Sequence, residues 1–158
     1  MSPLLNIHAS CVVLGRAGEP FGAPHDLGVL ILGESGAGKS DLALRLIANG
    51  AMLVADDRCD LFVSADVLHA RVPPKLQGMI EIRGAGIVNL PHRTCARIGL
   101  AVRLVPPGTI SRLPELTRYR PPDPLAVPES RWPTEIAIVA FEASAPAKIA
   151  AAAAAFGA

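Results

Sequence analysis

The stretch VLILGESGAGKSDLALRLI, residues 29–47, constrains the fold of this chain more than any other feature. The short, continuous apolar run at 27–32 suits a strand that is buried on both faces. Over residues 38–49 the apolar positions change to helical spacing. The segment 33–40 between them matches the phosphate-binding pattern G-x-x-x-x-G-K-[ST]. The sequence therefore predicts an α/β fold in which a strand, a phosphate loop and a helix follow one another.

The loop has the residue types that phosphate binding requires. Its glycines let the backbone curl so that several N–H groups point inward, and the helix N-terminus adds its positive end. We expect Lys39 to reach the β- and γ-phosphates of a nucleotide, and the Ser40 hydroxyl to bind Mg²⁺. The residues expected to surround the nucleotide phosphates are Gly33, Glu34, Ser35, Gly36, Ala37, Gly38, Lys39 and Ser40.

An acid pair, Asp56 and Asp57, directly follows an expected strand at 51–55. If the strands at 27–32 and 51–55 are parallel neighbours joined by the helix, both end at one edge of the sheet, beside the loop. One carboxylate there can hold Mg²⁺, and the other can accept a proton from an attacking hydroxyl. The alternative is a solvated turn, but the adjacent phosphate loop favours a site.

A second charged pair, Glu81 and Arg83, alternates on one face of a further expected strand, just before Gly84 and Gly86. Side chains at i and i+2 of a strand point the same way, so these two could hold a second metal and a phosphate. On spacing alone, a surface ion pair of little energetic value is the better explanation.

The rest of the chain completes a mixed sheet in a single expected domain over residues 1–158. The segment 106–133 contains eight prolines in 28 residues, which excludes a helix and a central strand and indicates an extended surface loop. The Ala-rich segment 146–156 is expected to be a helix. Further strands are expected at 6–14, at 60–72 with a turn at 65–66, at 79–90, at 98–105 and at 135–141.

Composition excludes several functional classes. The formal net charge of +1 and the absence of a basic run give no electrostatic footprint for nucleic acid. We see no signal peptide and no apolar run long enough for a membrane span, so we expect a cytoplasmic protein that does not bind membranes. The three cysteines are far apart in the sequence and form no CxxC pair, which indicates buried thiols and no zinc site.

Taken together, GESGAGKS (33–40), LVADD (53–57) and EIRGAGIVNL (81–90) resemble the catalytic, C-terminal domain of HPr kinase/phosphorylase. The upstream NIHASCVVLG (6–15) is similar to the first strand of that family. The resemblance implies an ATP- and Mg²⁺-dependent enzyme that phosphorylates a serine of HPr, a small phosphocarrier protein of the phosphotransferase system. It also implies an HPr kinase C-terminal domain-like fold.

The resemblance assigns a role to each candidate residue. Asp56 would be the base that takes the proton from the acceptor serine. Asp57 and Ser40 would hold Mg²⁺, and Glu81 would contribute to a metal site. His8 would lie beside the acid pair and support the chemistry.

The same resemblance extends to the substrate and the assembly. Arg83 would position the phosphate or the protein substrate. Because the chain begins almost directly at the catalytic domain, it resembles the short form found in alphaproteobacteria, whose partner would be an HPr of a regulatory, nitrogen-related system. The family forms hexamers, so a homo-oligomer is expected. The family's basic, glycine-containing late segment, which bears on dephosphorylation, is poorly matched by VPESRWPTEIAIVAF (127–141), in which Arg131 is the candidate substitute.

Three other interpretations share the loop. A small-molecule kinase would use an arginine-rich lid, for which the candidates are Arg112, Arg118, Arg120 and Arg131. A GTPase is disfavoured because no NKxD pattern is present to recognise guanine. A non-catalytic nucleotide-sensing module would keep Lys39 and Ser40 but would not need the acid pair.

Overall fold

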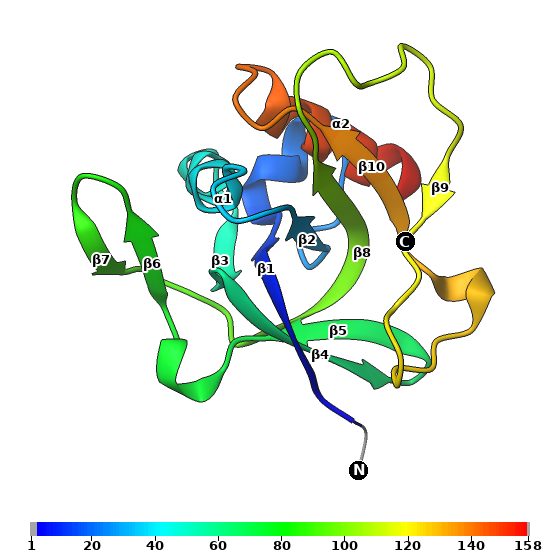
Figure 1. The fold of residues 1–158 in the computed structure, drawn as a ribbon, viewed down its shortest axis with the longest axis horizontal. Helices are drawn as coiled ribbons and strands as arrows, with labels where there is room; N and C mark the ends of the chain where they lie inside the picture. The colour runs from blue at the N-terminus through cyan, green and yellow to red at the C-terminus, as the bar shows by residue number, and fades with distance from the viewer. Residues whose placement is uncertain (1–2, 158) are drawn as a thin grey trace.

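The computed structural model describes residues 3–157, which form a strongly curved mixed sheet with two α-helices packed on one side of it (Figure 1). The strands are β1 (Leu5–Val13), β2 (Gly28–Leu32), β3 (Met52–Ala55), β4 (Arg58–Ser64), β5 (Val67–Arg71), β6 (Met79–Ile82), β7 (Gly86–Asn89), β8 (Cys95–Leu104), β9 (Thr117–Arg118) and β10 (Thr134–Ile138). The helices are α1 (Lys39–Ala48), α2 (Ala145–Phe156) and the short 3₁₀ turns Gly15–Phe21, Pro74–Leu76 and Glu129–Arg131. This is the mixed α/β fold that the sequence predicted.

The main sheet runs in the order β2-β1-β4-β5-β8-β10-β9, and β8 also pairs with β2. The pairings β2-β1-β4-β5-β8 therefore return to β2 and close a ring. The two long strands make this possible because each has two sets of partners along its length. The first half of β1 pairs with β4 and the second half with β2 and β3.

The position of β3 corrects one expectation. β2 and β3 are parallel to each other, but they are not neighbours, because both pair antiparallel with β1, which lies between them. Their carboxyl ends still lie at the same edge of the sheet. The acid pair after β3 therefore comes close to the loop after β2, although by a different topology from the expected one.

Two apolar cores lie on opposite faces of β2. Val29 and Ile31 pack with the helices on one face, while Leu30 and Leu32 pack on the other face with residues from β1, β4 and β5. All five residues of β2 are buried. This explains why the sequence of β2 is a continuous apolar run and does not alternate.

The remaining segments agree with the sequence in kind and differ in detail. The strand expected at 79–90 is instead a hairpin, β6–β7, which forms a separate two-stranded sheet, and its turn leaves Arg83 outside the strand on which it was expected. The proline-rich segment contributes no central strand, since β9 is two residues long and lies at the end of the sheet.

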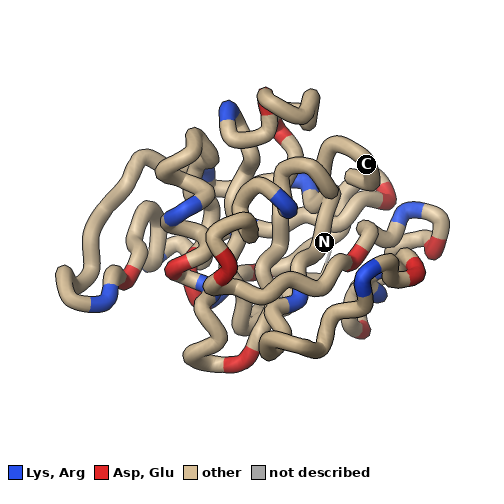
Figure 2. The backbone as a smooth tube through the Cα atoms, turned by 90° about the horizontal axis from the view of Figure 1, so that it is seen from above, with Lys and Arg blue, Asp and Glu red and all other residues tan. Residues whose placement is uncertain are grey.

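The distribution of charge and the length of the helices bear on possible partners. Lys and Arg positions are interspersed with Asp and Glu along the chain (Figure 2). Within residues 3–157, the helices are all too short or too polar to span a bilayer.

Candidate active site

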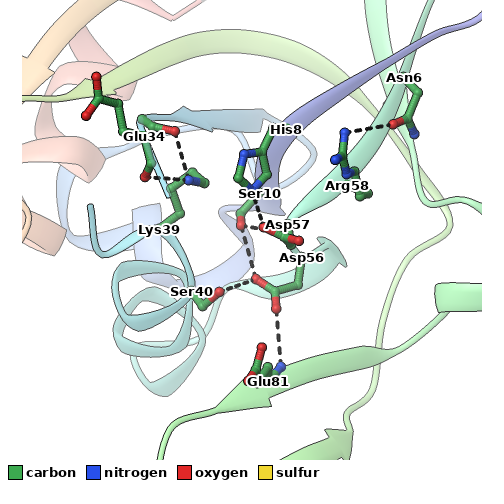
Figure 3. A network of polar contacts seen from close by, with 11 residues as sticks. Asn6, His8, Ser10, Glu34, Lys39, Ser40, Asp56, Asp57, Arg58 and Glu81 are labelled. Atoms are coloured by element: carbon green, nitrogen blue, oxygen red, sulfur yellow. Dashed lines mark hydrogen bonds and ion pairs between the residues drawn. The ribbon is translucent and has the colours of Figure 1, made fainter. Parts of the chain in front are cut away.

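The phosphate loop joins the end of β2 to the start of α1 (Figure 3). Gly36 and Gly38 have φ values of 83° and 102°, a left-handed conformation that suits glycine and lets the loop curl around the helix N-terminus. The Lys39 side chain is buried, and its Nζ donates hydrogen bonds to the carbonyls of Gly33 at 2.8 Å and Glu34 at 2.9 Å. The ammonium group therefore lies against the loop that it is expected to serve.

Asp56 lies directly behind the loop, where it is 9% exposed. Its Oδ1 accepts hydrogen bonds from Ser40 Oγ at 2.6 Å and from Ser10 Oγ at 3.1 Å. Its Oδ2 accepts the backbone N–H of Glu81 at 3.2 Å. Three donors from β1, α1 and β6 thus satisfy a nearly buried carboxylate, as a buried charge requires (Figure 3). The network joins the phosphate loop to the acid pair.

Asp57 has a different environment from its neighbour. Its φ of 67° is left-handed, a conformation that Asp adopts more readily than most residues, and its side chain is 62% exposed. Its Oδ1 contacts His8 Nε2, which projects from β1. Its backbone N–H donates to Ser10 Oγ at 3.2 Å. Asp56 and Asp57 are therefore adjacent in sequence but face opposite ways, one toward the core and one toward solvent.

Several candidate residues meet around one cavity of about 370 Å³. Ser40 and Asp57 line one side of it, and Glu81 and Arg83 of the β6–β7 hairpin line the other. Its donors include a hydroxyl and two carboxylates, the hard oxygen ligands that Mg²⁺ prefers alongside nucleotide phosphates. Within the described part of the chain, no three His, Cys, Asp or Glu side chains converge to hold a metal ion by themselves.

Ser10 is a site residue that the sequence did not identify. It is fully buried, and its hydroxyl bridges the two acids by donating to the carboxylate of Asp56 and accepting from the N–H of Asp57. A signal was present in the sequence. Asn6, His8 and Ser10 are polar residues at i, i+2 and i+4 of a strand whose other residues are apolar, so they share a face.

Three of the four arginines considered for a lid are held by other contacts. Arg118 Nη1 donates to the carbonyls of Ser130 and Trp132, and the Arg120 guanidinium lies over the Trp132 ring. Arg131 donates to the carbonyl of Ala65 in the β4–β5 turn. These contacts stabilise the proline-rich segment and give no support to a lid formed by these three arginines. Arg112 instead lines a surface cavity together with Pro107 and Phe141.

A buried strand, a G-x-x-x-x-G-K-S loop and an acid pair whose Asp56 accepts a hydrogen bond from the loop serine form an arrangement typical of P-loop domains. Comparison with known proteins narrows this class. Residues 24–97 match the family model described as the HPr Serine kinase C-terminal domain. Over these residues the chain is similar to this family of domains.

Curated relatives and a solved structure agree with the family match. The chain is 41% identical over 112 residues to an HPr kinase/phosphorylase of Verminephrobacter eiseniae, which covers 65% of this chain and 35% of the relative. It is 48% identical over 68 residues to one of Neisseria meningitidis, covering 42% of this chain and 21% of the relative. The chain thus spans about a third or less of these relatives. The Hpr(Ser) kinase/phosphatase of Coxiella burnetii has the same fold, with a TM-score of 0.70 and 25% identity over 92% of this chain and 91% of that chain.

Proposed function

We propose that this protein is an ATP-dependent protein kinase that phosphorylates a serine of an HPr-like phosphocarrier protein. The observation that carries the proposal is the hydrogen bond between Ser40 of the phosphate loop and Asp56, beside a cavity lined by Asp57, Glu81 and Arg83. A nucleotide-sensing module needs the loop but not these acids. The relatives named HPr kinase/phosphorylase supply the substrate class.

The loop would bind the ATP phosphates through its N–H groups and Lys39. Ser40, Asp57 and Glu81 would hold Mg²⁺, which supplies Lewis-acid stabilisation of charge on the phosphate oxygens. Arg83, exposed in the hairpin turn, would position the transferred phosphate or the protein substrate. Each donor already borders the same cavity, so assembly of the site requires no rearrangement of the sheet.

In the transfer step, the oxygen of the HPr serine forms a bond to the γ-phosphorus while the bond to the ADP oxygen breaks. The serine proton would go to Asp56, and His8 would hold Asp57 in place through their contact. Ser10 would fix the two acids relative to each other. The protein would act in the cytoplasm as a homo-oligomer. Light scattering would test whether this oligomer is a hexamer.

The primary experiment is transfer of label from γ-labelled ATP to purified HPr from the same organism. We expect label on an HPr serine with the wild type and none with Lys39→Ala. Absence of label on HPr, despite ATP binding by the wild type, would contradict the proposal. Small hydroxyl compounds would then be tested as acceptors.

Two matched variants test the division of roles within the acid pair. At saturating ATP and Mg²⁺, Asp56→Asn should reduce the rate of phosphate transfer about 100-fold or more, which is the usual contribution of a general base to the rate. Asp57→Asn should instead raise the Mg²⁺ concentration needed for half-maximal rate and recover at high Mg²⁺. If Asp57→Asn abolishes transfer at saturating Mg²⁺ while Asp56→Asn retains it, the two roles are reversed.

A further inference from the structure

Three loops converge at the edge of the sheet where the phosphate loop lies. β2, β8 and β10 are parallel, so the segments that leave their carboxyl ends lie at the same edge (Figure 1). These are the phosphate loop, residues 105–107 and residues 139–141. In sheets of this kind, ligands bind outside the carboxyl ends of parallel strands.

A hollow of about 800 Å³ lies between these three loops, and we call it the lateral hollow. Its two ends differ in chemistry. One end has His8 and the loop residues Glu34 and Ser35, next to the candidate active site. The other end is apolar. The apolar side chains that line it belong to Leu104, Val105, Pro106, Pro107, Val139, Ala140 and Phe141. Arg103 also lines the hollow, and its guanidinium is paired with the carboxylate of Glu135.

Phe141 is an aromatic side chain that is 69% exposed although it contacts the phosphate loop. A Cβ added at Gly38 would lie 2.8 Å from Phe141 Cζ, so the ring rests on the glycine that precedes Lys39. The ring borders both the lateral hollow and the cavity that contains Ser40. A large exposed aromatic surface thus lies directly beside the phosphate loop.

The segment that carries Phe141 is fastened to the helix of the phosphate loop. Arg45 of α1 donates to the carbonyl of Glu142 at 3.1 Å and to the carbonyl of Ala140, while its Nε is held by Asp41 at 3.0 Å. The carbonyls on both sides of Phe141 are therefore fixed to α1. The Phe141 ring therefore has a fixed position relative to the phosphate loop.

The apolar end offers a surface but few hydrogen bonds. Pro106 and Pro107 have no N–H group. The carbonyl of Val139 already accepts from the N–H of Glu142 at 3.3 Å, and that of Ala140 accepts from Arg45. This apolar surface can therefore pack against the face of a planar ring, but it cannot recognise the hydrogen-bonding groups on the ring's edge.

From these observations we infer that the lateral hollow takes the purine ring of the nucleotide, stacked on Phe141, and that it selects the ring by its face and not by its hydrogen-bonding edge. ATP and GTP therefore bind with similar affinity. This inference rests on the proposed nucleotide-dependent function and adds the base subsite to it.

The test compares nucleotides with inorganic tripolyphosphate, which has no base, by titration calorimetry with Mg²⁺. The wild type should bind ATP and GTP within about threefold of each other, because every base has a π-face. Phe141→Ala should lower the affinity for ATP and for GTP by about tenfold, the usual effect of losing one stacking contact. It should leave the affinity for tripolyphosphate unchanged. Phe141→Trp should restore nucleotide affinity. Phe21→Ala removes another exposed phenylalanine, which does not line the hollow, and should change neither affinity.

Three results would overturn the inference. They are unchanged ATP affinity in Phe141→Ala, an equal loss for tripolyphosphate, or ATP and GTP affinities that differ about 100-fold in the wild type. These results leave the proposed function standing if the wild type still labels HPr. Failure of the wild type to bind any nucleotide would instead contradict the proposed function itself.

Discussion

Ser10→Ala removes the hydroxyl that joins the two acids of the site. The hydroxyl is fully buried on β1, donates to Asp56 Oδ1 at 3.1 Å and accepts from the Asp57 N–H at 3.2 Å. Alanine fills nearly the same space, so the change leaves the apolar core intact. What is lost is one hydrogen bond to a carboxylate and the partner of one backbone N–H.

The size of the effect follows from these two contacts. A hydrogen bond to a charged group contributes about 1.5–3 kcal/mol, and both distances here are at the long end of the normal range, so a total loss of about 2 kcal/mol is expected. For a chain of 158 residues this corresponds to a fall in Tm of about 4–8 °C. Because Asp57 also holds a left-handed φ of 67°, its carboxylate loses its fixed position, and kcat should fall about tenfold.

Thermal unfolding followed by circular dichroism, together with HPr phosphorylation at saturating ATP, measures both effects. Ser64→Ala, at the exposed end of β4, makes the same chemical change outside the network and should alter neither quantity. A Ser10→Ala protein with wild-type Tm and kcat would refute the view that this hydroxyl organises the acid pair.

Three further predictions follow. Gly38→Ala places a Cβ 2.8 Å from Phe141 Cζ at a φ of 102°. ATP affinity should therefore fall more than about tenfold, and the free energy of unfolding should fall by about 1–3 kcal/mol. Calorimetry and denaturant unfolding measure these two effects, and an unchanged ATP affinity would contradict the prediction. Arg45→Ala removes the hydrogen bonds to the two carbonyls of the loop after β10. It should weaken ATP binding about threefold or more without altering tripolyphosphate binding. An equal loss of ATP and tripolyphosphate affinity would show that Arg45 acts on the phosphate loop instead. Burial raises the pKa of the Cys59 thiol from 9.0 to about 12 and raises the pKa of Cys11 as well. The unfolded chain therefore releases these protons first, and the free energy of unfolding should fall as pH rises from about 9 to 12. Denaturant unfolding at pH 8 and pH 10 measures it, with a Cys11→Ala, Cys59→Ala double variant expected to lose much of this pH dependence.

The strand, loop and helix around residues 27–49 could be predicted from the sequence because they are local. The change from a continuous apolar run to helical spacing occurs across the glycines of the loop, and each signal lies within a few residues of the structure it specifies. The proximity of Asp56 to the loop was also predicted correctly, since Ser40 Oγ lies 2.6 Å from its carboxylate. The reason given for it was wrong, because β1 lies between β2 and β3.

Strand order depends on contacts between distant residues, and one sequence gives no signal for them. Nothing local in β1 shows that its first half pairs with β4 and its second half with β2 and β3. Ser10 was missed for a related reason, because a small polar residue in a buried strand acquires its role only from partners 46 and 47 positions away. Arg83 was placed on a strand because alternation continues to it, whereas β6 ends at Ile82 and the turn begins there.

The most direct test of the account is single-turnover transfer of the γ-phosphate of ATP to HPr by the wild type and by Asp56→Asn, with ATP affinity measured on the same samples. We expect phosphoserine on HPr with the wild type, a rate lower by about 100-fold or more with Asp56→Asn, and similar ATP affinity in both. Equal rates in the two proteins would contradict the role of Asp56 as the base. Tight ATP binding by both, with no phosphoserine on HPr in either, would contradict the kinase function itself.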